Sequence, residues 1–295
     1  MDTHLYFCQK SMLYLIASVL FSASILILFR YFKRFGIDNL QAIIANYLIA
    51  SVIGFVAYEN PYTVNDIYTS PWFPMAVLLG FIFIGVFFLF ALSSQKAGVA
   101  VTAVASRMSV VIPVAGGFLL FGEQAGALKL IGIALALPAF YLTFKKKQSV
   151  KVSLALAILP FLIFIGTGTN DLLMKFTDYH YLSDDLYLLL ATIFVFSMTI
   201  GSFVLLIRLY KKQTTLRWKH FFAGLLLGLV NFASTYYMFR SMTVFESSVM
   251  FPVLNTGVVS IAALADYFLF GEKLSRTNWI GIALALIAIV FISMK

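Results

Sequence analysis

The chain has 295 residues, of which 62% are hydrophobic and only 11% are charged. Ordinary soluble domains carry about 25% charged residues, so this composition excludes a soluble enzyme, a secreted domain and a disordered chain. The net charge is +9, and the basic residues form short clusters between apolar runs. This pattern follows the positive-inside rule of membrane proteins. It does not indicate nucleic acid as a partner.

Ten apolar stretches follow one another along the chain, and each is long enough for a membrane-spanning helix of about 20 residues. The expected helices cover residues 11–31, 38–58, 72–95, 97–121, 126–144, 152–175, 185–209, 219–240, 246–270 and 275–294. No stretch shows the alternation of a lipid-facing barrel strand. The sequence therefore predicts an all-α integral membrane protein with ten transmembrane helices. Only Lys10 precedes the first apolar stretch and no clear cleavage site follows, so we expect a helix that is retained and not a signal peptide.

The distribution of Lys and Arg predicts the topology. Loops that follow odd-numbered helices hold 15 of these residues, whereas the termini and the other loops hold 5. Because cytoplasmic loops carry the excess of Lys and Arg, this count places the odd loops in the cytoplasm and both termini outside. We expect a multi-pass protein of the plasma membrane, the inner membrane of a bacterium, with membrane lipids as its surroundings.

Two sequence words occur twice with the same spacing of 149 residues. Leu-Phe-Gly-Glu and Ile-Gly-Ile-Ala-Leu-Ala-Leu occupy 120–123 and 131–137, and again 269–272 and 280–286. The chain is therefore predicted to consist of two repeats, 1–147 and 148–295, each with five helices. Since five is odd, the second repeat would enter the membrane inverted, an arrangement typical of transporters that alternate access around a central site.

Each copy of the first word places a glycine at the end of one helix and a glutamate, Glu123 or Glu272, near the start of the next. The glycine permits the turn, and the carboxylate suits the positive end of the helix dipole. We expect a capped turn at the membrane surface and not a catalytic or proton-carrying group.

The motif FGE-x7-IGIALAL, present twice and each time closing a five-helix repeat, resembles the EamA family of the drug/metabolite transporter superfamily. The segment from Phe268 to Ile292 is the closest match. The resemblance implies ten helices in two inverted repeats, with a central cavity lined mainly by helices one to four and six to nine. The sequence departs from the family at Phe21-Ser22, where Trp-Gly is common, and in its Lys and Arg count, because family members are usually drawn with cytoplasmic termini.

Arg107 is the ionisable residue that most needs a functional explanation. It lies ten residues past Ala97, about 15 Å along a helix, which is halfway across a hydrocarbon core of about 30 Å. A charge at that depth costs about 2.5–3.5 kcal/mol on insertion scales. One interpretation is a site for a carboxylate or other anionic group, which the bidentate guanidinium fork suits. The other is a structural ion pair with Asp171, Asp266 or Glu246, and a gate would combine the two.

The repeat register extends this candidate substrate site. Ser106 and Arg107 correspond to Asn255 and Thr256 after a shift of 149 residues. Each repeat thus places a polar pair near the midplane, where transporters with inverted repeats hold their substrate.

Helix six carries the polar run Gly-Thr-Gly-Thr-Asn-Asp at 166–171. Its glycines suit either close helix packing or an interrupted helix that exposes backbone groups to substrate. Asn170 is a candidate substrate contact, and Asp171 is the candidate for coupling to a proton or sodium ion, unless the nearby helix end leaves it solvated. Asn231 and Tyr236 are further candidate substrate contacts, for which an interhelical hydrogen bond is the alternative. The prolines expected to interrupt helices four, six and nine are Pro113, Pro160 and Pro252.

These features favour a secondary active transporter that moves a small metabolite, amino-acid-like or another small organic solute, by alternating access, with export favoured by the family resemblance. No nucleotide-binding motif occurs in the sequence, so the energy would come from a proton or sodium gradient or from exchange. One alternative is an uncoupled facilitator or channel.

A second alternative, from a different class, is an intramembrane enzyme that acts on lipid-linked substrates. Such an enzyme would need paired acids, a histidine cluster or a nucleophile with its base, whereas His4, His180 and His220 lie at scattered helix ends. One cysteine and three histidines supply no disulfide and no zinc or haem set, so we expect no cofactor. The expected partner is a small-molecule substrate, and the protein would be a monomer or a homodimer.

Overall fold

The computed structural model describes residues 2–96, 99–124, 126–144, 154–182, 185–271 and 275–293, and these residues are helical almost throughout, with no strand among them. The helices are α1 (Asp2–Phe35), α2 (Asn39–Ala57), α3 (Val64–Thr69), α4 (Phe73–Lys96), α5 (Val99–Met108), α6 (Val111–Leu120), α7 (Ala127–Phe144), α8 (Leu154–Tyr181), α9 (Leu186–Tyr210), α10 (Trp218–Met242), α11 (Ser247–Phe270) and α12 (Arg276–Ser293). The prediction of an all-helical protein is confirmed for this part of the chain.

Among the described residues, six helices are long and apolar enough to cross a membrane: α1, α2, α4, α9, α10 and α11. Three shorter apolar helical segments cover Ala105–Leu120, Ala127–Ala139 and Arg276–Phe291. The 28 residues of α8 span about 42 Å at the rise of an α-helix. The protein is thus a multi-pass membrane protein, while the count of ten spans and their inverted arrangement stay predictions.

The chain forms two compact units, and each unit takes segments from both halves of the sequence. Unit 1 comprises Met1–Ile84 and Phe176–Arg240, and unit 2 comprises Gly85–Lys175 and Ser241–Lys295. The predicted boundary between the repeats, at residue 147, lies outside the described residues. The repeats 1–147 and 148–295 therefore remain a prediction about the sequence duplication.

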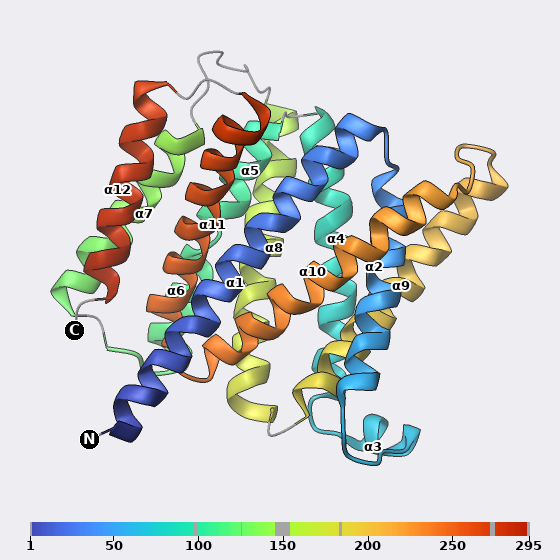
Figure 1. The fold of residues 1–295 in the computed structure, drawn as a ribbon, viewed down its shortest axis with the longest axis horizontal. Coiled ribbons are helices and arrows are strands. Elements are labelled where there is room, and N and C mark those ends of the chain that lie inside the picture. Colours follow the sequence, from blue (N-terminus) through green and yellow to red (C-terminus); the bar gives the residue numbers. More distant parts are fainter. Residues whose placement is uncertain are drawn as a thin grey trace. The chain divides into compact units, whose positions relative to one another are not determined.

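In unit 1, α2 lies along α9 (Figure 1). Glycines permit this close approach, because a Cβ at Gly54 would lie 2.8 Å from the Cβ of Ala191. The helix α10 approaches α2 in the same way, since a Cβ at Gly228 would lie 2.8 Å from the carbonyl oxygen of Asn46. Small residues at helix contacts are the usual basis of packing in a membrane, where lipid removes the hydrophobic drive for helices to associate.

Polar contacts hold both ends of the α2–α9 pair. At the start of α2, the hydroxyl of Thr214 donates to the carboxylate of its N-cap residue, Asp38, at 3.3 Å. At the end of α2, the hydroxyl of Tyr58 and the indole N–H of Trp72 donate to Asp185, at 2.8 and 3.4 Å. These contacts connect loops that are far apart in the sequence, and they stabilise unit 1 at both ends of the α2–α9 pair.

In unit 2, α7 and α12 lie side by side (Figure 1). Both helices have 18 residues, and α12 begins and ends 149 residues after α7, which is the spacing of the sequence words. The glycines that precede these helices in the repeated word share a left-handed backbone, with φ of 63° at Gly122 and 64° at Gly271. This agreement in helix bounds and backbone angle supports the duplication.

The predicted helix over 97–121 is wrong as a single element, because two helices, α5 and α6, meet at Ser109 and Val110. Pro113 explains the position of the break. It has no N–H to donate to the Ser109 carbonyl four residues earlier, and its ring collides with that carbonyl in a regular helix. The Ser109 carbonyl instead accepts from the N–H of Ile112, at 2.9 Å. The interruptions expected at the other two prolines do not occur, since α8 and α11 continue through Pro160 and Pro252.

The helix α8 also extends past its predicted end at residue 175. Lys175, which we assigned to a loop in the topology count, is consequently buried inside the helix. Its ammonium donates to the backbone carbonyl of Met242, the last residue of α10. A lysine in this position satisfies a helix-terminal carbonyl and suits the negative end of the helix dipole.

Candidate functional site

Arg107 lies in the last turn of α5, directly before the break between α5 and α6. Its Nη1 donates a hydrogen bond of 2.8 Å to the Oδ1 of Asn255 on α11. Asn255 is buried, and its own Nδ2 donates to the carbonyl of Phe251 at 3.0 Å, which fixes the amide with its oxygen toward the guanidinium. The repeat register predicted both residues as substrate contacts, and the structure brings them together.

Asp171 on α8 is the acidic side chain that interacts electrostatically with this arginine. Of the other partners that we considered, Glu246 instead forms an ion pair with Lys129, so the pairing of Arg107 with Glu246 is wrong. The side chain of Asp266 lies outside the described residues.

A face of α8 beside Asp171 carries polar atoms that find no hydrogen-bond partner. Thr167, Asn170 and Asp171 stand at positions i, i+3 and i+4, which lie on one face of a helix. The Oγ1 of Thr167 and the Oδ1 of Asn170 are buried without a partner. Buried polar atoms in proteins are almost always hydrogen-bonded to protein or ordered water, so these two oxygens are candidates for contact with a bound group or a water molecule.

Two further oxygens of this kind are on α11. The hydroxyls of Thr256 and Ser260 are buried without a hydrogen-bond partner, and Thr256 is the residue after Asn255. Ser106, the remaining predicted member, is half-buried, and its backbone carbonyl accepts from the hydroxyl of Ser109 at 2.6 Å. Of the predicted residues, Arg107, Ser106, Asn170, Asp171, Asn255 and Thr256 all belong to unit 2.

The other two predicted contacts belong to unit 1 and have partners of their own. Asn231 on α10 donates to the Oδ1 of Asn46 on α2 at 3.1 Å, which is the interhelical hydrogen bond that was the alternative interpretation. The ring of Tyr236 stacks on that of Tyr187 with centroids 5.2 Å apart, and its hydroxyl accepts from the Nε of Arg240 at 3.2 Å. The predicted site residues thus form two clusters, one in each unit.

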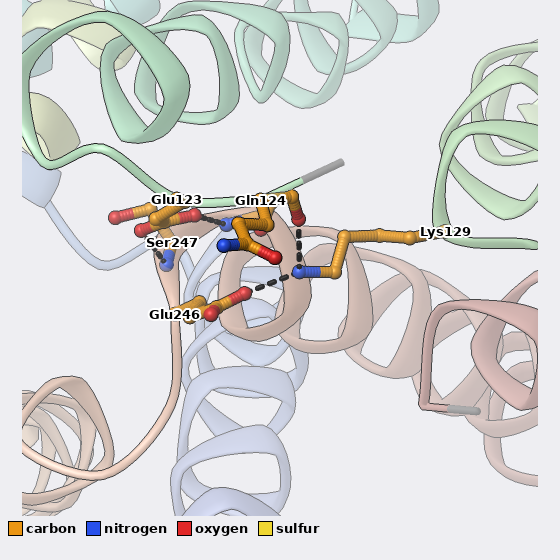
Figure 2. A network of polar contacts seen from close by, with 6 residues as sticks. Glu123, Gln124, Lys129, Glu246 and Ser247 are labelled. Atoms are coloured by element: carbon orange, nitrogen blue, oxygen red, sulfur yellow. Dashed lines mark hydrogen bonds and ion pairs between the residues drawn. The ribbon is translucent and has the colours of Figure 1, made fainter. Parts of the chain in front are cut away.

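Glu123 caps a helix, but a different helix from the one that we predicted. Its carboxylate accepts hydrogen bonds of 2.6 and 2.8 Å from the N–H groups of Ser247 and Ser248, the first two residues of α11 (Figure 2). Gly117 makes room for it, because a Cβ there would lie 2.6 Å from the carboxylate. The expected role as a capping group is confirmed, whereas the expected location at the start of α7 is wrong. Glu272 lies outside the described residues.

A second pair of contacts joins the same segments. Lys129 on α7 donates to the backbone carbonyl of Gln124 at 3.0 Å and forms the ion pair with Glu246 (Figure 2). The loop after α6 is therefore tied to the residues that begin α11. Since α11 carries Asn255, these contacts position the helix that holds Arg107.

The interruption of helix four that the sequence predicts at Pro113 is confirmed by the break between α5 and α6. Sequence reasoning did not single out Thr167, whose Oγ1 is buried without a hydrogen-bond partner. Its signal was the polar run Gly166–Asp171, because a polar helix face inside a membrane is energetically costly.

The model of the EamA-like transporter family matches residues 156–294, the second half of the chain. An uncharacterized protein of Haemophilus influenzae is 25% identical over 283 residues, which cover 93% of this chain and 95% of that protein. A solved crystal structure with 11% sequence identity matches with a TM-score of 0.78 over 96% of this chain and 97% of its own, and this likeness shows the fold alone.

The family match confirms the resemblance seen in the repeated motif. The matched family is one of transporters, and the match covers the second half of the chain. Among the described residues, no three His, Cys, Asp or Glu side chains come together in a way that could hold a metal ion.

Proposed function

We propose that this EamA-like protein is a secondary active transporter that moves a small metabolite with a carboxylate or other anionic group by alternating access. The bacterial inner membrane is the proposed location. The observation that carries the proposal is Arg107, held by Asn255 and placed beside Asp171 at a helix break.

The chemistry of Arg107 supports an anionic solute. A guanidinium has five N–H donors in a planar fork that matches a carboxylate, and Asn255 accepts from one nitrogen of that fork. A neutral amide holds the arginine in place without neutralising its charge. The positive charge is thus available to Asp171 in one state and to the solute in another.

The helix break supports a binding role for the same point in the fold. Discontinuous helices expose backbone groups that bind substrates and ions in transporters. Here Arg107 is the basic residue of the last turn of α5, at the negative end of that helix. The dipole of α5 stabilises the guanidinium and therefore lowers the cost of keeping it charged inside the membrane.

Exchange of partners at Arg107 would couple the solute to an ion. When the anionic group of the solute binds the guanidinium, Asp171 loses its cationic partner. The freed carboxylate then favours a proton or a sodium ion, since an unpaired charge in a low-dielectric environment is costly. Solute and ion would cross together by this linkage, because the binding of each favours the binding of the other.

The test is a transport assay in proteoliposomes, with solutes chosen by a thermal-shift screen of amino acids, nucleosides, sugars and organic acids. We expect hits among carboxylate-bearing compounds, and we expect Arg107→Ala and Arg107→Lys to lose transport while Arg208→Ala, at the exposed end of α9, retains it. Normal uptake by a well-folded Arg107→Ala variant, or hits confined to compounds without an anionic group, would contradict the proposed site. Flux that persists after ion gradients are collapsed would identify a facilitator.

A further inference from the structure

The α8 face that carries Asp171 presents oxygen atoms in excess of donors. The Oγ1 of Thr167 and the Oδ1 of Asn170 are buried without a partner, and both belong to the same face as the carboxylate. The amide nitrogen of Asn170 lies 3.5 Å from the sulfur of Met174, and the Asn170 side chain also donates to the carboxylate of Asp171. Its amide oxygen, a pure acceptor, belongs to the unpartnered set.

The helix break lies close to α8, beside the face that carries Asp171. Because Pro113 lacks an N–H, the Ser109 carbonyl accepts instead from the N–H of Ile112, at 2.9 Å. Gly168 lies against this carbonyl, since a Cβ at Gly168 would lie 2.8 Å from the Ser109 oxygen. Gly168 stands at position i+1, whereas this face consists of positions i, i+3 and i+4, so the Ser109 oxygen lies beside the face and not on it.

The charge of this set suits a monovalent cation. Hard cations bind oxygen ligands, and divalent ions in proteins usually take several carboxylates. Here one carboxylate, Asp171, stands with neutral oxygens, and Arg107 is already a positive neighbour. A single positive charge is balanced by Asp171 once the guanidinium has moved to another anion, whereas a second charge would be left uncompensated.

We infer that Thr167, Asn170 and Asp171 form a sodium site on one face of α8, next to the break between α5 and α6. This inference rests on the proposed function and assigns Asn170 to the coupling ion instead of the substrate. The sodium ion and Arg107 compete for Asp171. Sodium binding therefore releases the guanidinium for the anionic group of the solute, and the order of binding follows from that competition.

The experiment measures sodium binding without any solute. The purified full chain is melted in NaCl, KCl and choline chloride at equal ionic strength, and the half-saturating concentration of NaCl is obtained from the rise in melting temperature. We expect a rise that is specific to NaCl. We expect Thr167→Val and Asn170→Ala to raise the half-saturating concentration about tenfold or more, which corresponds to about 1.4 kcal/mol. The matched control is Thr199→Val, because Thr199 is exposed on α9 and bonds only to the Val195 carbonyl of its own helix.

Arg107→Ala gives the opposite signature. Removing the competing guanidinium should lower the half-saturating concentration of NaCl by about threefold or more, since Asp171 then serves the sodium ion alone. If Thr167→Val does not fold, Thr167→Ser keeps the oxygen and should keep the sodium response, and binding of radioactive sodium to the unmodified protein provides an independent measurement.

Equal melting curves in the three salts would overturn the sodium site, and so would a sodium response that Thr167→Val and Asn170→Ala leave unchanged. These failures are distinct from failure of the proposed function. Loss of transport in Arg107→Ala without any sodium response refutes the inference alone. A sodium response with the expected variant pattern, together with normal transport by Arg107→Ala, refutes the proposed substrate site alone.

Discussion

The two units treat their buried polar groups differently. In unit 1, polar side chains pair with one another across helices, as Asn231 does with Asn46 and Tyr58 with Asp185. In unit 2, Thr167, Asn170 and Thr256 keep oxygens that are buried without partners. Paired polar groups in a membrane stabilise contacts between helices. Unpaired polar groups there are energetically unfavourable, and proteins typically keep them at binding sites. The contrast is between polar residues that pair across helices in unit 1 and residues that we propose bind solute or ion in unit 2.

The helices differ in the same sense. In unit 1, α2 is continuous and approaches α10 closely at Gly228. In unit 2, the helix next to the polar residues is interrupted, because α5 ends at Met108 and α6 begins at Val111. Substitutions in unit 1 should therefore lower stability, and substitutions at the unit 2 cluster should lower transport with less effect on folding.

The largest expected effect is on transport by variants of Arg107. Arg107→Ala should weaken solute binding about 30-fold or more, because loss of one partner of a buried charged contact costs about 2–5 kcal/mol. Asn231→Ala, in the paired cluster of unit 1, should leave transport per folded molecule within about threefold and cost about 0.6 kcal/mol of stability. Solute titrations and melting curves on both variants measure the two effects. If Asn231→Ala reduces transport as strongly as Arg107→Ala does, the proposed difference in role between the polar residues of the two units is wrong.

Glycine contacts give the next largest effect. Gly228→Ala should destabilise the protein by about 1–3 kcal/mol, since its Cβ would lie 1.7 Å from the Cγ2 of Ile49 and 2.8 Å from a backbone oxygen of α2. Gly85→Ala, on α4, is the matched control, because no atom lies within 4 Å of the added Cβ. We expect the control to be neutral or slightly stabilising, as alanine favours the helix. Thermal unfolding in one detergent measures both, and equal melting temperatures would show that α10 can shift away from α2.

The cap on α11 should have a smaller effect. Glu123→Ala removes the acceptor for the N–H groups of Ser247 and Ser248, and loss of a helix cap costs about 1–2 kcal/mol. Gln124→Ala is the control, since only its backbone carbonyl takes part in the network. Hydrogen exchange at the start of α11 should rise in the first variant and not in the second. Unchanged exchange in Glu123→Ala would mean that water replaces the carboxylate without loss.

The smallest effect is expected at α3, outside the membrane spans. Hydrogen bonds from the backbone N–H and hydroxyl of Thr63 hold the pKa of Asp66 below its usual range. Because the folded pKa is depressed, the capping box stabilises α3 at neutral pH, and this contribution is lost as the pH falls through that pKa. Amide exchange in α3 should therefore rise at acidic pH in the unmodified protein. In Asp66→Asn it should already be raised at neutral pH, and a flat pH profile in the unmodified protein would contradict this assignment.

Part of this structure could be predicted from sequence and part could not. Apolar length predicts helices, and the 149-residue spacing predicts that α7 and α12 share bounds. The same spacing linked Arg107 to the 255–256 pair before the structure placed Asn255 against it. Composition and spacing are local or periodic signals, and these features follow from them.

Contacts set by tertiary packing lie beyond such signals. Nothing in the neighbourhood of Glu123 indicates that it caps a helix that begins at Ser247. Tyr236 and Arg107 are both polar groups on apolar helices, so sequence alone assigned them to one site, and only the packing separates them into different units.

The break before Pro113 also affects how a solute would lie in the site. The duplicated sequence has Ala262 at the position of Pro113 and Thr256 at that of Arg107, and α11 is continuous there. The two copies therefore differ where the solute is proposed to bind. An asymmetric site would bind the two ends of a solute differently. The solute would therefore keep one orientation relative to α5 throughout its passage. Molecules that differ only in which end is anionic would then be distinguished by the carrier.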